Sequence, residues 1–170
     1  MSAVSEEFAA DVDTLIQRPD MDEAERSAFL EKFSDDNANT LVGFAVMGGF
    51  FGEGIDLVGE RLTGAAIVGV GLPGLSPERD QIRDHFDRTA GSGFDYAYVF
   101  PGMNRVLQAA GRVIRSESDR GAILLDDERF SQARYRRLLP AEWRPVVVAD
   151  EAELRETLTT FWSQNAGAPV

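Results

Sequence analysis

Gly64–Leu72, GAAIVGVGL, is a nearly continuous apolar run in which hydrophobic and polar residues do not alternate. Thr40–Met47, TLVGFAVM, has the same character, and Gly121–Leu125 and Pro145–Ala149 repeat it in shorter form. Strands that are buried on both faces have this composition, as in a parallel sheet covered by helices. We therefore expect these four segments to be strands of a mainly parallel sheet.

Helical patterns separate the apolar runs. Asp22 followed by Glu25 predicts a capping box, and Ser76 followed by Pro77 predicts a cap and a first helical position. Alternating strands and helices indicate a layered α/β fold. Besides a strand at Val12–Gln17, the pattern predicts helices at Ser2–Ala10, Glu23–Phe33, Glu78–Arg88, Met103–Arg115 and Glu151–Trp162.

The composition limits the classes of protein that fit. A length of 170 residues with 44% hydrophobic residues suits one domain with a sound core. The sequence has no cysteine, which excludes a disulfide framework, a thiolate metal site and an iron–sulfur cluster within these residues. No segment resembles a targeting sequence or a membrane span. We expect a soluble, cytoplasmic protein with no membrane partner.

The net charge is -12, and such an acidic surface repels phosphate at long range. Contact with nucleic acid would have to rest on a local basic patch. Tyr135 and its neighbours Arg134, Arg136 and Arg137 form one small cluster of that kind. A solvated helix end is an equally good interpretation of the cluster.

Gly69–Gly74, GVGLPG, matches the G-x-G-x-x-G pattern of dinucleotide-binding turns. In those turns the helix opens within the glycine turn, whereas Ser76 and Pro77 delay it here. Pro73 also removes a backbone donor from the loop. A strand end that turns out of the sheet is the favoured interpretation, and a dinucleotide enzyme is the minor one.

Gly48–Gly59, GGFFGEGIDLVG, places Glu53 and Asp56 among glycines after a predicted strand. Loops at the carboxyl ends of parallel strands are where open α/β sheets bind ligands, and Gly54 permits close approach of a ligand to the backbone. The alternative is a simple turn in which Asp56 caps free N–H groups.

Gln108–Arg115, QAAGRVIR, carries the most informative pattern. On a helix, Gln108, Arg112 and Arg115 fall within roughly 60° of one another. Two arginines and an amide on one stripe suit a polyanion such as a triphosphate, and Gly111 would permit close approach. A solvated basic face paired with carboxylates is the alternative, and spacing alone does not separate the two.

Asp126 and Asp127 follow a predicted strand, as the magnesium-binding carboxylates of nucleotide hydrolases do. The chain has no G-x-x-x-x-G-K-[ST] loop, and its single lysine, Lys32, follows Glu31. A capped strand end is the preferred interpretation, and we assign no metal ligand. His85 is expected to be a surface residue.

Taken together, GGFFGEGIDLVGERLTGAAIVGVGLP (48–73) and QAAGRVIRSESDRGAILLDDERF (108–130) resemble motifs V and VI of the XPD/DinG-like superfamily 2 DNA helicases. The resemblance runs from about Val12 to Trp143. It implies the second of two RecA-like domains, a three-layer α/β domain over residues 1–163 with a flexible tail at 164–170. Such a pair of domains sandwiches ATP and translocates single-stranded DNA.

By position, the resemblance makes Glu53, Gly54 and Asp56 the nucleotide-facing part of motif V, with Gly111 on the same side. It makes Gln108, Arg112 and Arg115 the catalytic set of motif VI, in which arginine reaches the γ-phosphate of ATP.

The sequence also departs from the family. The first motor domain, which would hold most of the ATP and Mg²⁺, is not in the sequence, and the strand that bears motif IV is not found. We therefore expect a fragment or truncated reading frame whose sheet lacks its first strand and which is inactive alone. Gly52 replaces the serine common before EGID. The alternative function is a non-catalytic, helicase-like interaction domain.

Overall fold

The computed structural model describes residues 12–34, 36–49, 61–114 and 119–165. Its first unit is a pair of parallel strands, β1 (Val12–Ile16) and β2 (Thr40–Phe44), joined through helix α1 (Glu23–Glu31). The capping box at the start of α1 is confirmed. Asp22 accepts from the Glu25 N–H at 2.8 Å, and Glu25 accepts from the Asp22 N–H at 3.0 Å.

The second unit is built on another parallel pair, β3 (Gly64–Val68) and β4 (Ala122–Asp126). Helix α3 (Pro77–Ala90), a π-helical turn η2 (Asp95–Val99) and helix α4 (Phe100–Ala110) connect the two strands. After β4 come a 3₁₀ turn η3 (Glu128–Ser131), helix α5 (Ala133–Arg136) and helix α6 (Glu151–Asn165). Most of the predicted elements are therefore confirmed.

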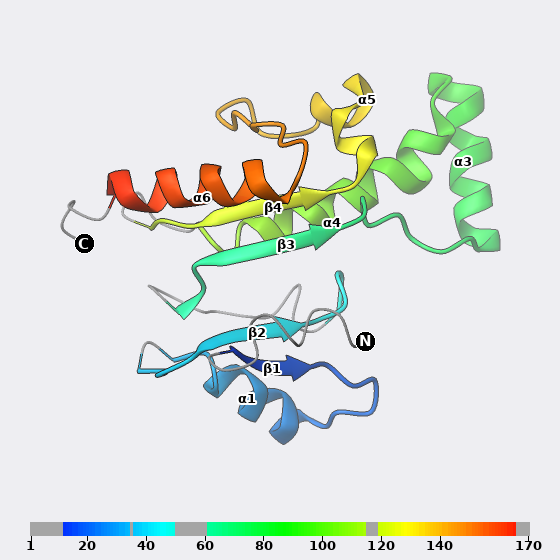
Figure 1. The fold of residues 1–170 in the computed structure, drawn as a ribbon. Coiled ribbons are helices and arrows are strands. Elements are labelled where there is room, and N and C mark those ends of the chain that lie inside the picture. The colour runs from blue at the N-terminus through cyan, green and yellow to red at the C-terminus, as the bar shows by residue number, and fades with distance from the viewer. Residues whose placement is uncertain (1–11, 35, 50–60, 115–118, 166–170) are drawn as a thin grey trace.

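Helices cover both faces of the β3–β4 pair, which gives the three layers of the fold (Figure 1). On one face, Met103 and Val106 of α4 pack with Ile67 and Val70 and are almost completely buried. On the other face, Leu154 and other residues of α6 lie over β4. Apolar residues of α1 cover the β1–β2 pair in a smaller core around Met21 and Phe29.

The expectation that the strands are buried on both faces is wrong for much of their length. Phe44 of β2 is 53% exposed, and Val68 of β3 is 72% exposed. The physical reason is that the described strands form two separate two-stranded sheets instead of one sheet. Each strand pairs with a single other strand among the described residues. Apolar side chains that would be covered inside a wider sheet therefore remain exposed to solvent.

The predicted strand at Pro145–Ala149 is also wrong. These residues form no strand, and the Val146 and Val147 residues are 70% and 71% exposed. An extended segment becomes a strand only when it finds a backbone partner, and Pro145 lacks an N–H for a ladder. In the described part of the chain the segment borders a cavity between α6 and β4 without pairing to β4.

The glycine-rich turn after β3 has a structural role. Gly69 and Gly71 have φ values of 86° and 62°, which favour glycine, and α3 begins only at Pro77. Ser76 caps that helix as predicted.

The helix that the sequence predicts at Ser2–Ala10 lies outside the described residues. Helix α6 runs through Asn165, so 164 and 165 of the predicted tail are helical and 166–170 lie outside the description. No helix in the described ranges has the length and apolarity to cross a membrane.

Candidate functional site

Helix α4 positions the candidate arginine site. Pro101 stands in its first turn, and Gly102 lets the loop after β3 lie directly against the helix. A Cβ atom at Gly102 would come within 2.6 Å of the Val70 carbonyl oxygen. The helix is therefore held tightly against the carboxyl end of β3, and its buried side, Met103, Val106 and Ala110, fixes which residues face outward.

The expected helical stripe over Gln108, Arg112 and Arg115 is corrected by the structure. Helix α4 ends at Ala110, with Gly111 as its C-cap, so only Gln108 is on the helix. Gln108 is exposed. Arg112 lies in the following turn, where its N–H donates to the Ala109 carbonyl at 3.2 Å, and Arg115 lies outside the described residues.

Packing of Val113 explains why the helix ends early. Val113 is buried, and its side chain lies where a Cβ on Gly121 would be, 2.2 Å from that position. The chain must leave the helix axis to seat Val113 beside the start of β4, and glycine at 111 weakens the helix at that point. Arg112 is half-buried on this turn and has an interaction partner within the chain. The backbone of Arg112 is held on both sides, because Ala110 before it and Val113 after it are buried.

The loop after β2 meets the same helix. Gly48 has a φ of 79°, and a Cβ there would lie 2.8 Å from Nε of Arg105, so the Arg105 side chain packs on the bare glycine. Arg105 also donates to the Gly71 carbonyl at 3.3 Å. It stands one helical turn before Gln108. The structure thus brings the start of the Gly48–Gly59 segment and the Gln108–Arg112 segment to one helix, although Glu53, Gly54 and Asp56 lie outside the described residues.

Asp126, the last residue of β4, and Asp127 form the capped strand end that the sequence favoured. Asp127 accepts from the Arg129 backbone N–H at 2.9 Å and from Nε and Nη2 of the Arg129 side chain at 2.8 and 2.7 Å. These side-chain hydrogen bonds lower the pKa of Asp127 from its ordinary value and raise the pKa of Arg129. Asp126 ends the strand in solvent. Within the described ranges, no three metal-binding side chains gather at a common point.

The basic cluster at 134–137 is organised around a carboxylate that the sequence analysis missed. Asp95, in the π-helical turn, is buried, and Arg134 binds its Oδ1 through Nε at 2.7 Å and Nη2 at 2.5 Å. Nη2 of Arg137 lies 3.9 Å from Oδ2 of the same carboxylate, and the Arg134 guanidinium lies over the Phe94 ring. Tyr135 is buried in the core. Arg134 is thus a structural cation, and its spacing of 39 residues from Asp95 gave no sequence signal.

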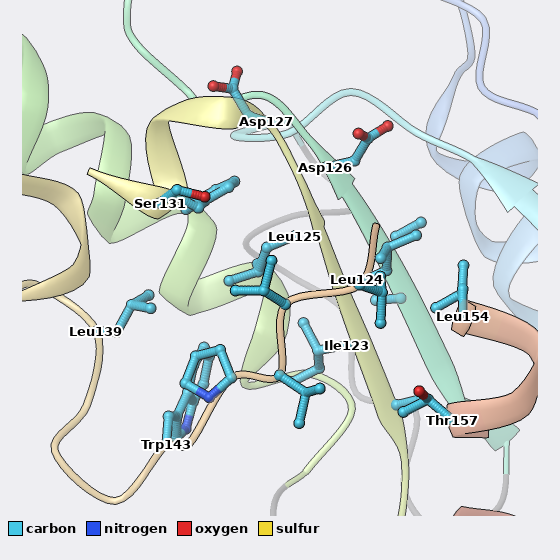
Figure 2. Close-up of a pocket in the computed structure, with 18 of the residues that line it drawn as sticks. Ile123, Leu124, Leu125, Asp126, Asp127, Ser131, Leu139, Trp143, Leu154 and Thr157 are labelled. Carbon is cyan, nitrogen blue, oxygen red and sulfur yellow. The ribbon is translucent and has the colours of Figure 1, made fainter. Parts of the chain in front are cut away.

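A cavity of about 840 Å³ lies between the β3–β4 pair and α6, and Arg136 of the basic cluster is one of the residues that line it. Figure 2 shows Ile123 and Leu125 of β4 facing Trp143 and Leu139 across it, whereas Asp126 and Asp127 point away at the strand end. Its lining is mainly apolar. It is an open hollow beneath α6 whose lining includes the exposed Val146 and Val147, and neither Gln108 nor Arg112 lines it.

These features define a layered α/β domain with parallel strands, helices on both faces of the β3–β4 pair and an arginine-bearing turn after α4. A solved XPD helicase has a similar fold, with a TM-score of 0.59 and 19% sequence identity over 79% of this chain and 24% of that chain. The helicase C-terminal domain model matches residues 1–146. The chain belongs to that family.

Curated relatives are helicases. The chain is 29% identical over 147 residues to a regulator of telomere elongation helicase 1 homolog of Oryza sativa subsp. japonica, covering 79% of this chain and 14% of the relative. It is 29% identical over 119 residues to the ATP-dependent DNA helicase DinG of Photobacterium profundum, covering 69% and 17%. The chain therefore spans less than a fifth of the length of these two relatives.

Proposed function

We propose that this chain is the C-terminal motor domain of an ATP-dependent DNA helicase and supplies arginine to an ATP site completed by an N-terminal motor domain. The observation that carries the proposal is the meeting of two segments at α4. Gly48 packs on Arg105, Gln108 lies one turn further along α4, and Arg112 lies in the turn after the helix. The helicase C-terminal domain model that matches residues 1–146 covers both segments.

In this proposal, Arg112 is the main catalytic cation, with Arg115 and Gln108 beside it. The transferring phosphoryl group carries charge on its oxygens, and an arginine presented from another domain stabilises that charge. Arg112 is suited to this because the turn that bears it is anchored by buried Val113. The proposed nucleotide-facing residues Glu53, Gly54, Asp56 and Gly111 would line the same interdomain side.

The residues present fit the cationic part of an ATP site and do not fit its phosphate cradle. The sequence has one lysine, Lys32, and no phosphate-binding loop around it. We therefore assign ATP and Mg²⁺ mainly to the N-terminal motor domain. When bound, Mg²⁺ would neutralise charge on the β- and γ-phosphates.

Single-stranded DNA is the proposed polymer substrate. Arg136 and Arg137 are the residues of the basic cluster that we expect to reach its phosphates, because Arg134 is held by Asp95. Arg137 keeps 65% of its side chain exposed. A contact of this kind would weaken with rising salt.

The test measures ATP hydrolysis by the chain alone and by a protein that joins it to an N-terminal helicase motor domain. We expect no turnover by the chain alone and DNA-stimulated turnover by the joined protein. Arg112→Ala should lower kcat by about 10³-fold or more, as loss of an arginine finger does. Arg112→Lys should recover little, because an ammonium lacks the planar fork of a guanidinium.

Arg155→Ala is the matched control, since Arg155 is an exposed arginine on α6. It should leave kcat unchanged. Turnover by the chain alone, or unchanged turnover in Arg112→Ala, would refute the proposed role. A joined protein that is folded and binds DNA but hydrolyses no ATP would favour the non-catalytic alternative.

A further inference from the structure

Arg105 contacts two loops from its position on α4. Its Nε and Cδ lie 2.8 and 2.9 Å from the position that a Cβ on Gly48 would take, so the side chain rests on the bare glycine after β2. Its Nη1 donates to the Gly71 carbonyl, in the loop after β3, at 3.3 Å. One half-buried side chain therefore joins the carboxyl ends of β2 and β3 to the helix that carries Gln108.

The loop after β2 presents Gly48 to Arg105 in a defined turn. The Gly49 N–H donates to the Val46 carbonyl at 3.2 Å, and Gly48 has a φ of 79°. This hydrogen bond, with a positive φ at the third residue, is typical of a type II turn. The Gln17 side chain accepts from the Val46 N–H at 2.8 Å. The turn is therefore held at its first residue by Gln17 and at its third by Arg105.

Side-chain contacts fix this turn relative to α4. The β1–β2 and β3–β4 pairs are separate sheets in the described ranges, so no strand ladder there sets the position of the turn. One contact is Sδ of Met47, which lies 3.3 Å from the position of a Cβ on Gly71. A methionine side chain is flexible and packs in many ways, whereas a planar guanidinium that also donates a hydrogen bond fixes a direction. Arg105 is therefore the contact that orients the turn.

The same side of α4 leads from Arg105 to the arginine-bearing turn. Residues three apart are neighbours on a helix surface, so Gln108 lies next to Arg105 along α4. Arg112 follows in the turn after the helix, where the Val113 N–H donates to the Ala110 carbonyl at 3.0 Å. Helix α4 thus connects the loop after β2 with Arg112, and Arg105 is the point at which the helix touches that loop.

We infer that Arg105 is a positioning residue for ATP hydrolysis, because it holds the Val46–Gly49 turn against α4 and so aligns the loop after β2 with Arg112. The inference rests on the proposed function and adds a residue to it. Arg105 acts through its contacts with Gly48 and Gly71 and does not itself touch phosphate. A displacement of about 1 Å in an active site can lower the rate by about 100-fold, so loss of this contact should be visible in kcat.

The first measurement needs no ATP. Residue-resolved amide hydrogen exchange compares the 170-residue chain with its Arg105→Ala variant. The Gly49 N–H closes the turn, and its exchange should become at least about tenfold faster in the variant, because a turn without its packing partner opens at lower free energy. The Gln17 and Gly69 amides donate across the β1–β2 and β3–β4 pairs. Their rates should stay unchanged, which shows that both pairs remain folded.

Arg79→Ala is the matched control for exchange. Arg79 is also half-buried, and it donates to a backbone carbonyl of another element, that of Ala97, at 2.7 Å. Its removal deletes the same kind of hydrogen bond at a place that does not touch the turn. The exchange rate of the Gly49 amide should therefore change by less than about twofold in this control, as expected for a site without shared partners.

The second measurement follows DNA-stimulated ATP hydrolysis by the joined motor protein. Arg105→Ala should lower kcat by about 10- to 100-fold. The KM for ATP should stay within about twofold, because alignment acts in the transition state. In an Arg112→Ala background, the same substitution should lower kcat by less than about a further twofold, since no arginine is left to align. A smaller folded fraction would instead lower kcat by the same factor in both backgrounds.

The inference is overturned if the Gly49 amide exchanges at the wild-type rate in Arg105→Ala, or if Arg79→Ala accelerates it equally. It is also overturned if Arg105→Ala leaves kcat unchanged, or lowers kcat equally with and without Arg112. Each of these results leaves the proposed function standing, because that function is judged by Arg112→Ala. A wild-type joined protein that hydrolyses no ATP overturns the proposed function and the catalytic part of this inference, and exchange at Gly49 still decides whether Arg105 holds the turn.

Discussion

The ion pair between Asp95 and Arg134 should contribute far more to stability than the exposed pairs of this acidic chain. Asp95 keeps 12% of its side chain exposed and Arg134 keeps 42%, and two guanidinium nitrogens bind one carboxylate oxygen at 2.7 and 2.5 Å. The pair links the π-helical turn before α4 to α5. Its loss should therefore loosen the support of the helix that carries Gln108.

The two single substitutions should differ in how much they lower the free energy of unfolding. Arg134→Met keeps an aliphatic stem over Phe94 but leaves the Asp95 carboxylate buried, with Arg137 at 3.9 Å as its remaining cation. We expect a loss of about 2–3 kcal/mol, below the value for a fully buried pair because Arg134 is partly solvated. Asp95→Asn leaves a guanidinium that water can reach, and should lose about 1–2 kcal/mol.

A double-mutant cycle measured by urea unfolding isolates the pair itself. We expect a coupling energy of about 1–2 kcal/mol for Asp95 with Arg134. The matched control is Glu151 with Arg155, an i,i+4 pair on α6 whose side chains are 80% and 60% exposed. That pair should couple by about 0.3–0.5 kcal/mol.

A coupling energy for Asp95 and Arg134 no larger than that of the control would refute the reasoning. It would show that Asp95 is hydrated in solution and that Arg134 is available to bind DNA. In that case Arg134→Met would weaken DNA binding of the joined motor protein without lowering its stability.

Three further outcomes are expected. Gly102→Ala places a Cβ 2.6 Å from the Val70 carbonyl oxygen and should destabilise the chain by about 1–3 kcal/mol in urea unfolding, whereas Gly74→Ala, with open space around the Cβ, should change it little. Met103→Ala empties a site that is 2% exposed and should lose about 2–5 kcal/mol, and a loss under 1 kcal/mol would contradict the packing described for α4. Because the folded pKa of Asp127 lies below its ordinary 3.8, its contribution is present above that pH and disappears as pH falls through the folded value. The difference in unfolding free energy between wild type and Asp127→Asn should shrink as the pH falls from 6 to 3. A difference that widened would contradict the expected direction.

Local signals in the sequence predicted most of the elements, because caps and apolar runs act over a few residues. Asp22, Glu25, Ser76 and Pro77 placed two helix starts correctly. Pro145–Ala149 failed for a physical reason: strand formation needs a backbone partner, and composition says nothing about which partner is present. The same limit explains why the sequence predicts a buried Val68 whereas Val68 is exposed in the structure.

The candidate site shows the difference between residue type and residue placement. The pattern Gln108–Arg112–Arg115 assumed one uninterrupted helix, and its spacing would suit one. The structure differs because Gly121, the glycine before β4, leaves room for the Val113 side chain. The chain therefore leaves the helix axis after Ala110. Arg112 then lies in a short turn between the buried residues Ala110 and Val113. Proteins that present arginine to a neighbouring domain benefit from such a base, because a fixed guanidinium needs little reorganisation when the phosphate charge develops. Arg112→Lys is the sharpest test of this point: if a fixed, forked cation is required, lysine on the same rigid turn should restore little of the activity.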